Sequence, residues 1–175
     1  MEKAIRAFQF LFNILNHICI VVVTIYVTWH CFLMNLSDKF IVQYDMHVWL
    51  CTLGYQLMMA EAILTLYSSN CWSFFYAPKT KRTLHWLIQV IGSLMAIVGT
   101  TVFYSTRQFH FQTTHSITGL ISLIFAVVGC INGIAAINTQ KVYKKYRIRP
   151  VVSKMFHKFI GIASFVLGMM SLFYG

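Results

Sequence analysis

The sequence predicts an all-α protein, a bundle of helices that crosses a membrane several times. Of its 175 residues, 58% are hydrophobic and only 10% are charged, a share of apolar residues that a water-soluble fold of this size cannot bury. Five apolar segments each exceed the roughly 20 residues needed to cross a hydrocarbon layer about 30 Å thick. We expect one transmembrane domain covering residues 1–175, with helices at about 10–34, 45–68, 83–105, 114–137 and 155–175.

The positive charges predict the orientation of this bundle. The net charge is +10, and only Lys39 and Arg107 lie on the face opposite the N-terminus. The other basic residues lie before the first segment and in the loops after the second and fourth segments, and cytosolic loops are the ones enriched in Lys and Arg. The N-terminus is therefore predicted to be cytosolic, and the charge does not indicate a nucleic-acid partner. The basic loop after the fourth segment also suits anionic lipid headgroups.

The first segment, 10–34, contains His17 and His30. Bulky residues surround both, so we interpret them as satisfied or interfacial histidines.

The second segment begins near Asp45, an acidic residue suited to a helix N-terminus. It places His47 close to the exterior face and Glu61 deeper in the membrane, on roughly the same helix face. An intramembrane carboxylate is a functional candidate. A structural hydrogen bond to a neighbouring helix is an equally good interpretation.

A basic cluster, Lys79, Lys81 and Arg82, precedes the third segment and its His85. Such residues beside Trp86 are typical of membrane anchoring. Their position next to a histidine also suits a small anion, which would find both charge and hydrogen-bond donors there.

The four later segments share one pattern, a histidine followed at helical spacing by small or polar residues. The faces are His47 with Cys51, Gly54, Glu61 and Thr65; His85 with Gln89, Gly92, Ala96 and Gly99; His115 with Gly119, Ser122, Gly129 and Gly133; and His157 with Gly161, Ser164, Gly168 and Ser171. Such stripes are often helix-packing faces. Four of them together favour room for a flat group between helices.

Antiparallel connectivity predicts which histidines share a depth. The second and fourth segments start at the exterior face, which pairs His47 with His115, and the third and fifth start at the cytosolic face, which pairs His85 with His157. Two imidazoles can fill both axial positions of a haem, which favours electron transfer. The two irons would lie about 20 Å apart along the membrane normal. Zinc is less favoured because further ligands, apart from Asp45, are lacking nearby.

These motifs resemble the cytochrome b561 family, in particular its D-type branch. The matching stretches are AEAILTLY, HWLIQVIGSLMAIVG and HSITG, together with His157 and Gly161. The resemblance implies a di-haem core of four helices within a bundle of six, of which the sixth is not found here. Ser68 stands where many members have arginine.

The resemblance also implies a function. Family members use two haem b groups to pass electrons from cytosolic ascorbate to monodehydroascorbate or ferric iron on the other side, as ascorbate-dependent oxidoreductases. It implies that His85 and His157 hold the cytosolic haem and that His47 and His115 hold the lumenal or exterior one. Candidate ascorbate-binding residues are Lys79, Lys81 and Arg82, and candidate acceptor-side residues are Arg107 and His110.

An endoplasmic reticulum or vesicle membrane is expected rather than the plasma membrane, and a homodimer is compatible with the family. Two alternatives remain open at this point. The chain could be a haem-binding membrane anchor that receives electrons from a partner protein, or a haem-free helical scaffold.

Overall fold

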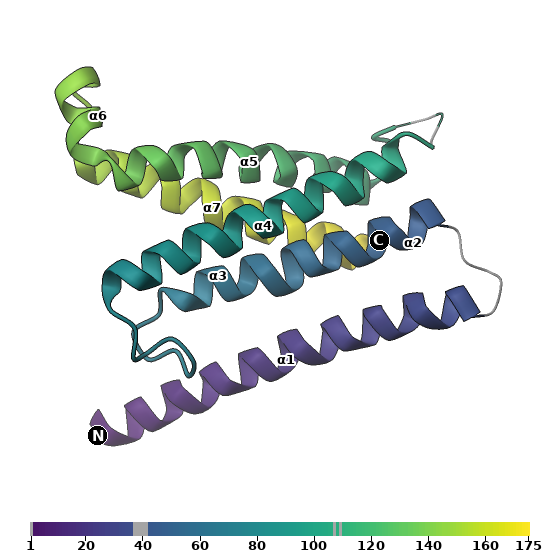
Figure 1. The fold of residues 1–175 in the computed structure, drawn as a ribbon, viewed down its shortest axis with the longest axis horizontal. Coiled ribbons are helices and arrows are strands. Elements are labelled where there is room, and N and C mark those ends of the chain that lie inside the picture. Colours follow the sequence, from purple (N-terminus) through teal and green to yellow (C-terminus); the bar gives the residue numbers. More distant parts are fainter. Residues whose placement is uncertain (1, 37–41, 107, 109) are drawn as a thin grey trace. The chain divides into compact units, whose positions relative to one another are not determined.

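The computed structural model describes residues 2–36, 42–106, 108 and 110–175, and the regular structure of these residues is entirely helical (Figure 1). The chain forms two compact units, Met1–Thr106 and Arg107–Gly175.

The first unit contains three long helical rods. Helix α1 spans Glu2–Leu36, and α4 spans Pro78–Tyr104. The third rod is built from α2 (Val42–Cys51), the π-helix η1 (Thr52–Met59) and α3 (Ala60–Thr65), and we call it the α2–α3 rod. It packs against both other helices and runs antiparallel to them (Figure 1).

Glycines bring the α2–α3 rod and α4 into backbone contact. A Cβ atom added to Gly54 would lie 2.7 Å from the carbonyl oxygen of Gly92, and one added to Gly92 would lie 2.9 Å from the carbonyl oxygen of Gly54. Only residues without a side chain permit such an approach, as is common where membrane helices cross.

The second unit pairs α5 (Thr114–Ile137) with α7 (Pro150–Tyr174), joined by the short α6 (Thr139–Tyr146). A capping box between Thr113 and Ser116 starts α5. Two reciprocal hydrogen bonds join the long helices at their centre. The Ser122 hydroxyl donates to the Ser164 carbonyl (2.7 Å), and the Ser164 hydroxyl donates to the Ser122 carbonyl (2.9 Å).

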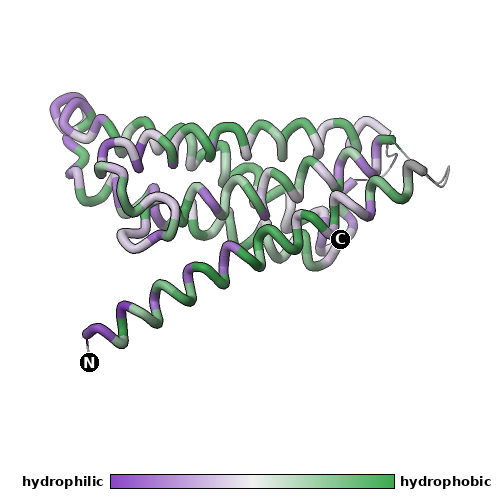
Figure 2. Tube along the Cα trace, turned by 60° about the horizontal axis from the view of Figure 1, so that its bottom comes forward, coloured by the Kyte–Doolittle hydropathy of each residue, from purple (hydrophilic) through white to green (hydrophobic). Residues whose placement is uncertain are grey.

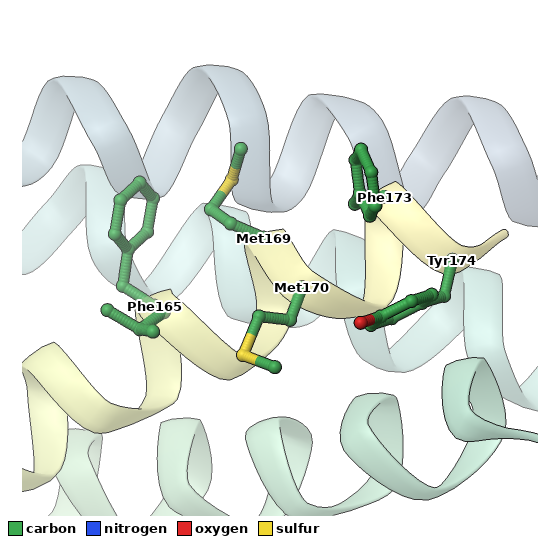
Figure 3. A pocket seen from close by; sticks show the side chains of 6 residues that line it. Phe165, Met169, Met170, Phe173 and Tyr174 are labelled. Atoms are coloured by element: carbon green, nitrogen blue, oxygen red, sulfur yellow. The ribbon is translucent and has the colours of Figure 1, made fainter.

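Among the described residues, five helical rods are long and apolar enough to cross a membrane, which confirms the predicted number of spans. They are Glu2–Met34, Val42–Thr65, Pro78–Tyr104, Thr114–Ile137 and Pro150–Tyr174. Hydrophobic residues predominate along these rods, whereas α6 is hydrophilic (Figure 2). Near the end of α7, apolar side chains that include Phe165, Met169 and Phe173 line a pocket (Figure 3). Helices suit lipid because their backbone groups are satisfied internally.

Several predicted boundaries were wrong. Helices α4 and α7 begin at Pro78 and Pro150, each five residues earlier than predicted. Both prolines occupy the first helical turn, where the missing N–H would have no partner and the fixed φ favours a helix. Helix α1 begins at Glu2 instead of residue 10, and α3 ends at Thr65 instead of residue 68. The predicted span 114–137 matches α5.

Candidate functional site

All four candidate histidines use the same ring atom in the same way. In each, Nδ1 lies within hydrogen-bond distance of a backbone carbonyl on the antiparallel neighbour. The pairs are His47 with Gly99 (3.1 Å), His85 with Ala62 (2.8 Å), His115 with Ser171 (2.8 Å) and His157 with Gly129 (3.1 Å). A carbonyl oxygen only accepts, so Nδ1 carries the proton and a neutral ring has its lone pair on Nε2. Metal-binding histidines are typically held by such a bond from their other nitrogen.

The hydrogen bonds define two levels in the first unit. His85 is level with Ala62 on the α2–α3 rod, and His47 is level with Gly99 on α4. Gly99 follows His85 by fourteen residues, which corresponds to about 21 Å along the helix axis. The two imidazoles therefore lie near opposite ends of the helix pair.

The second unit repeats this spacing. His115 is level with Ser171 on α7, and His157 is level with Gly129 on α5. Each carbonyl again lies fourteen residues beyond the histidine of its own helix, about 21 Å at 1.5 Å per residue. Both units therefore present one imidazole at each of two levels with the same separation.

The π-helix η1 makes this match possible in the α2–α3 rod. Ala62 follows His47 by fifteen residues instead of fourteen, and η1 lies between them. A π-helical segment accommodates an additional residue within a helix, often at a functional site.

Because η1 lies between His47 and Glu61, Glu61 lies on a different helix face from the one predicted. A uniform helical step placed Glu61 on the face of His47. In the structure the Glu61 carboxylate contacts His17 of α1 at 2.6 Å, whereas His47 contacts α4. The structural interpretation of Glu61, a bond to a neighbouring helix, therefore has direct support, and His17 is satisfied as predicted.

The small-residue stripes mainly serve helix packing. The residue seven positions after each histidine makes the central contact of its unit. These residues are Gly54 and Gly92, which contact each other in the first unit, and Ser122 and Ser164, which contact each other in the second. Gly161 differs, because a Cβ atom there would have no neighbour within 4 Å. The prediction that the stripes make room for a flat group therefore does not apply to the tightly packed Gly54 and Gly92.

Three buried polar atoms in the described part of the chain have no hydrogen-bond partner there. They are Gln89 Oε1, Asn132 Nδ2 and Ser153 Oγ. Gln89 is one turn after His85, and Ser153 is one turn before His157. Asn132 precedes Gly133, where a Cβ atom would lie 3.2 Å from the ring of His157.

Two of these atoms, Asn132 Nδ2 and Ser153 Oγ, are donors near one histidine level. They suit an acceptor such as a haem propionate, so the residues present fit a haem group. Neither residue was predicted from the sequence. The available signal was a polar side chain within about one turn of a histidine level on an apolar helix.

The predicted basic cluster separates into two kinds of residue. Lys81 is only 8% exposed, and its Nζ donates to the carbonyl oxygen of Tyr67 at 3.0 Å. Lys79 and Arg82 are exposed at the start of α4. Lys81 therefore holds the chain before α4, and the other two present their charge to solvent.

The predicted acceptor-side residues give less information. His110 is half-buried beside Phe111, with ring centroids 6.0 Å apart. Arg107 lies outside the described residues.

Comparison with known proteins identifies the family of this chain. The family model for eukaryotic cytochrome b561 matches residues 46–175, which include all four histidines. The chain is similar to the human "Transmembrane reductase CYB561D2", with 23% identity over 136 residues, covering 75% of this chain and 60% of the human protein. The mouse protein of the same name is 23% identical over 139 residues, covering 75% of this chain and 63% of that protein.

The chain thus spans less than two thirds of the length of these relatives. No solved structure matches it significantly. The family match covers most of the chain, and the curated relatives lie in the D-type branch. The chain belongs to the eukaryotic cytochrome b561 family, as a D-type member.

Proposed function

We propose that this protein carries electrons across a membrane through two haem b groups, from cytosolic ascorbate to monodehydroascorbate or ferric iron on the other side. The observation that carries the proposal is the equal spacing of the two histidine levels in both units. Two helix pairs with the same spacing can offer facing imidazoles at both levels at once. A single haem would need only one such level.

In this proposal one imidazole from each unit serves each haem. His47 and His115 would hold the exterior haem, and His85 and His157 the cytosolic one. The backbone carbonyls that accept from Nδ1 fix the ring orientation, so that Nε2 would be available to bind the iron. A bound haem b supplies a one-electron iron couple, and two axial imidazoles favour electron transfer over oxygen chemistry. Residues 1–175 would then act as one domain.

The donor side is expected at the exposed charges of α4. Ascorbate is an anion at neutral pH, so Lys79 and Arg82 would attract it, helped by the positive end of the α4 dipole. Lys81 would contribute indirectly because its ammonium group is already bonded to Tyr67. The positive-inside pattern supports this face as cytosolic, in an endoplasmic reticulum or vesicle membrane.

The proposal is tested with protein purified in detergent and then reconstituted in vesicles. We expect ascorbate to reduce both b haems, and external ascorbate to reduce ferricyanide enclosed in the vesicles. Haem that only dithionite reduces would contradict the ascorbate reaction and indicate an anchor that receives electrons from a partner. Protein without Soret absorbance would contradict haem binding altogether.

A further inference from the structure

A polar network in the first unit lies outside the electron-transfer site described above. The imidazole of His17 on α1 lies 2.6 Å from Glu61 Oε1 and 2.7 Å from Asn70 Oδ1. The indole N–H of Trp72 donates to Glu61 Oε2 at 2.9 Å. The network therefore joins α1 and α3 to the segment of residues 66–77, which leads into α4. We call His17, Glu61, Asn70 and Trp72 the latch.

The hydrogen-bond directions along the latch can be read from its ends. The Ser73 hydroxyl donates to the carbonyl oxygen of Thr65 (3.0 Å), which only accepts. Asn70 Nδ2 must then donate to Ser73 (2.8 Å), which turns Asn70 Oδ1 towards His17. His17 Nε2 consequently carries a proton.

At the other end, the Trp72 indole can only donate, so Glu61 Oε2 accepts. One proton remains, and it lies between His17 Nδ1 and Glu61 Oε1. The pair is neutral overall whichever atom holds this proton, which makes it compatible with a membrane-spanning segment.

Two further hydrogen bonds hold the same segment. The backbone N–H of Cys71 donates to Asn13 Oδ1 of α1 at 2.8 Å, and Lys81 Nζ donates to Tyr67 O at 3.0 Å. The segment is therefore fixed both to α1 and to α4. Glu61 also directly precedes Ala62, whose carbonyl accepts from His85, so one turn of α3 supports both the latch and a candidate haem ligand.

We propose that His17 and Glu61 are positioning residues that hold residues 66–77 against α1 and α3, and so keep the start of α4 in place for an anionic electron donor. The donor part of this inference rests on the proposed function. The claim that the latch holds residues 66–77 in place rests only on the hydrogen bonds of the first unit.

Two substitutions distinguish the contribution of the hydrogen bonds of the latch from that of the Glu61 carboxyl group. His17→Ala removes the group that bridges Glu61 and Asn70, leaving Asn70 Oδ1 without its donor. Glu61→Gln is the matched control. Its amide can donate to His17 Nδ1 while its carbonyl accepts from Trp72, so the number of hydrogen bonds is kept and the carboxyl group is lost.

Cys71 is a native reporter for the segment, being half-buried and bonded through its backbone to Asn13. We would measure how fast a membrane-impermeant maleimide alkylates Cys71 in membrane fragments whose two faces are both accessible. The variant Cys71→Ser shows how much of the labelling comes from other cysteines. His17→Ala should raise the rate about tenfold, because the bonds lost involve a charged or proton-sharing pair. Glu61→Gln should stay within about twofold of the wild type because every hydrogen bond can be remade.

The same variants are then assayed with ascorbate. His17→Ala should raise the KM for ascorbate without lowering the haem content or the maximal rate. Equal Cys71 alkylation in the wild type and His17→Ala would overturn the latch. Faster alkylation with an unchanged KM would overturn its role in donor positioning.

A second variant, Asn70→Ala, tests the latch if His17→Ala cannot be expressed as folded protein. Asn70→Ala removes the acceptor from the segment and leaves the His17–Glu61 contact intact, and it should also expose Cys71. A wild-type alkylation rate in Asn70→Ala would contradict the latch. Alkylation requires neither haem nor ascorbate, so a failure of the proposed function would not be mistaken for a failure of the latch.

Discussion

Replacing Gly92 by alanine should force α4 away from the α2–α3 rod. The new Cβ would lie 2.8 Å from Met58 Cβ and 2.9 Å from the Gly54 carbonyl oxygen, whereas ordinary contacts begin at 3.4 Å. The helices must separate by about half an ångström, since one of the two obstacles is backbone and cannot rotate away.

Two effects oppose each other in the stability of Gly92→Ala. Overpacking costs about 1–3 kcal/mol, and the better helix propensity of alanine returns about 1 kcal/mol. Taking the middle of the first range, a net loss of about 1 kcal/mol remains, which should lower the melting temperature by about 3 °C. His85 lies seven residues before Gly92, and Gly99, the acceptor for His47, lies seven residues after it. The separation should therefore lengthen both histidine hydrogen bonds, so haem retention should fall.

Gly129→Ala is the matched control, because its nearest neighbour would be Ile160 Cγ2 at 3.8 Å, an ordinary contact. We would measure thermal unfolding of both variants by fluorescence-detected size exclusion, together with haem content. The control should keep the wild-type melting temperature or exceed it. If Gly92→Ala is as stable as the control, the close backbone contact at Gly54 and Gly92 is refuted.

Three further predictions concern the histidine levels and the donor surface. His115→Ala should remove the exterior haem while ascorbate still reduces the cytosolic one, and an unchanged haem-to-protein ratio would contradict the assignment. The double variant Ser122→Ala/Ser164→Ala loses two reciprocal hydrogen bonds and should be destabilised by about 1 kcal/mol; unaltered thermal unfolding would contradict their contribution. Lys79→Ala and Arg82→Ala should each raise the KM for ascorbate about two- to fivefold, with a smaller salt dependence than the wild type, and salt-independent kinetics in the wild type would count against an electrostatic donor site.

The helices could be predicted because membrane spans depend mainly on apolar length. Their starts could not, because Pro78 and Pro150 look like loop residues although both occupy the first helical turn. The four histidines stood out for a physical reason, since an imidazole in an apolar segment needs a partner.

The helix faces were predicted only where the helix is regular. The π-helix η1 leaves no signal in a pattern analysed at 100° per residue, so Glu61 was placed on the wrong face. The latch was missed for a related reason. His17 and Asn70 are 53 residues apart, and neither the 3.6-residue period nor any motif connects them.

The most direct test of the central claim is the number of six-coordinate b haems in two double variants. Wild-type protein should contain two per chain by pyridine haemochrome, with low-spin spectra. His47→Ala/His115→Ala removes both ligands of one proposed haem and should keep one six-coordinate haem. His47→Ala/His157→Ala removes one ligand from each haem and should keep none. A six-coordinate haem that survives in the second variant and is lost from the first would contradict the proposed pairing.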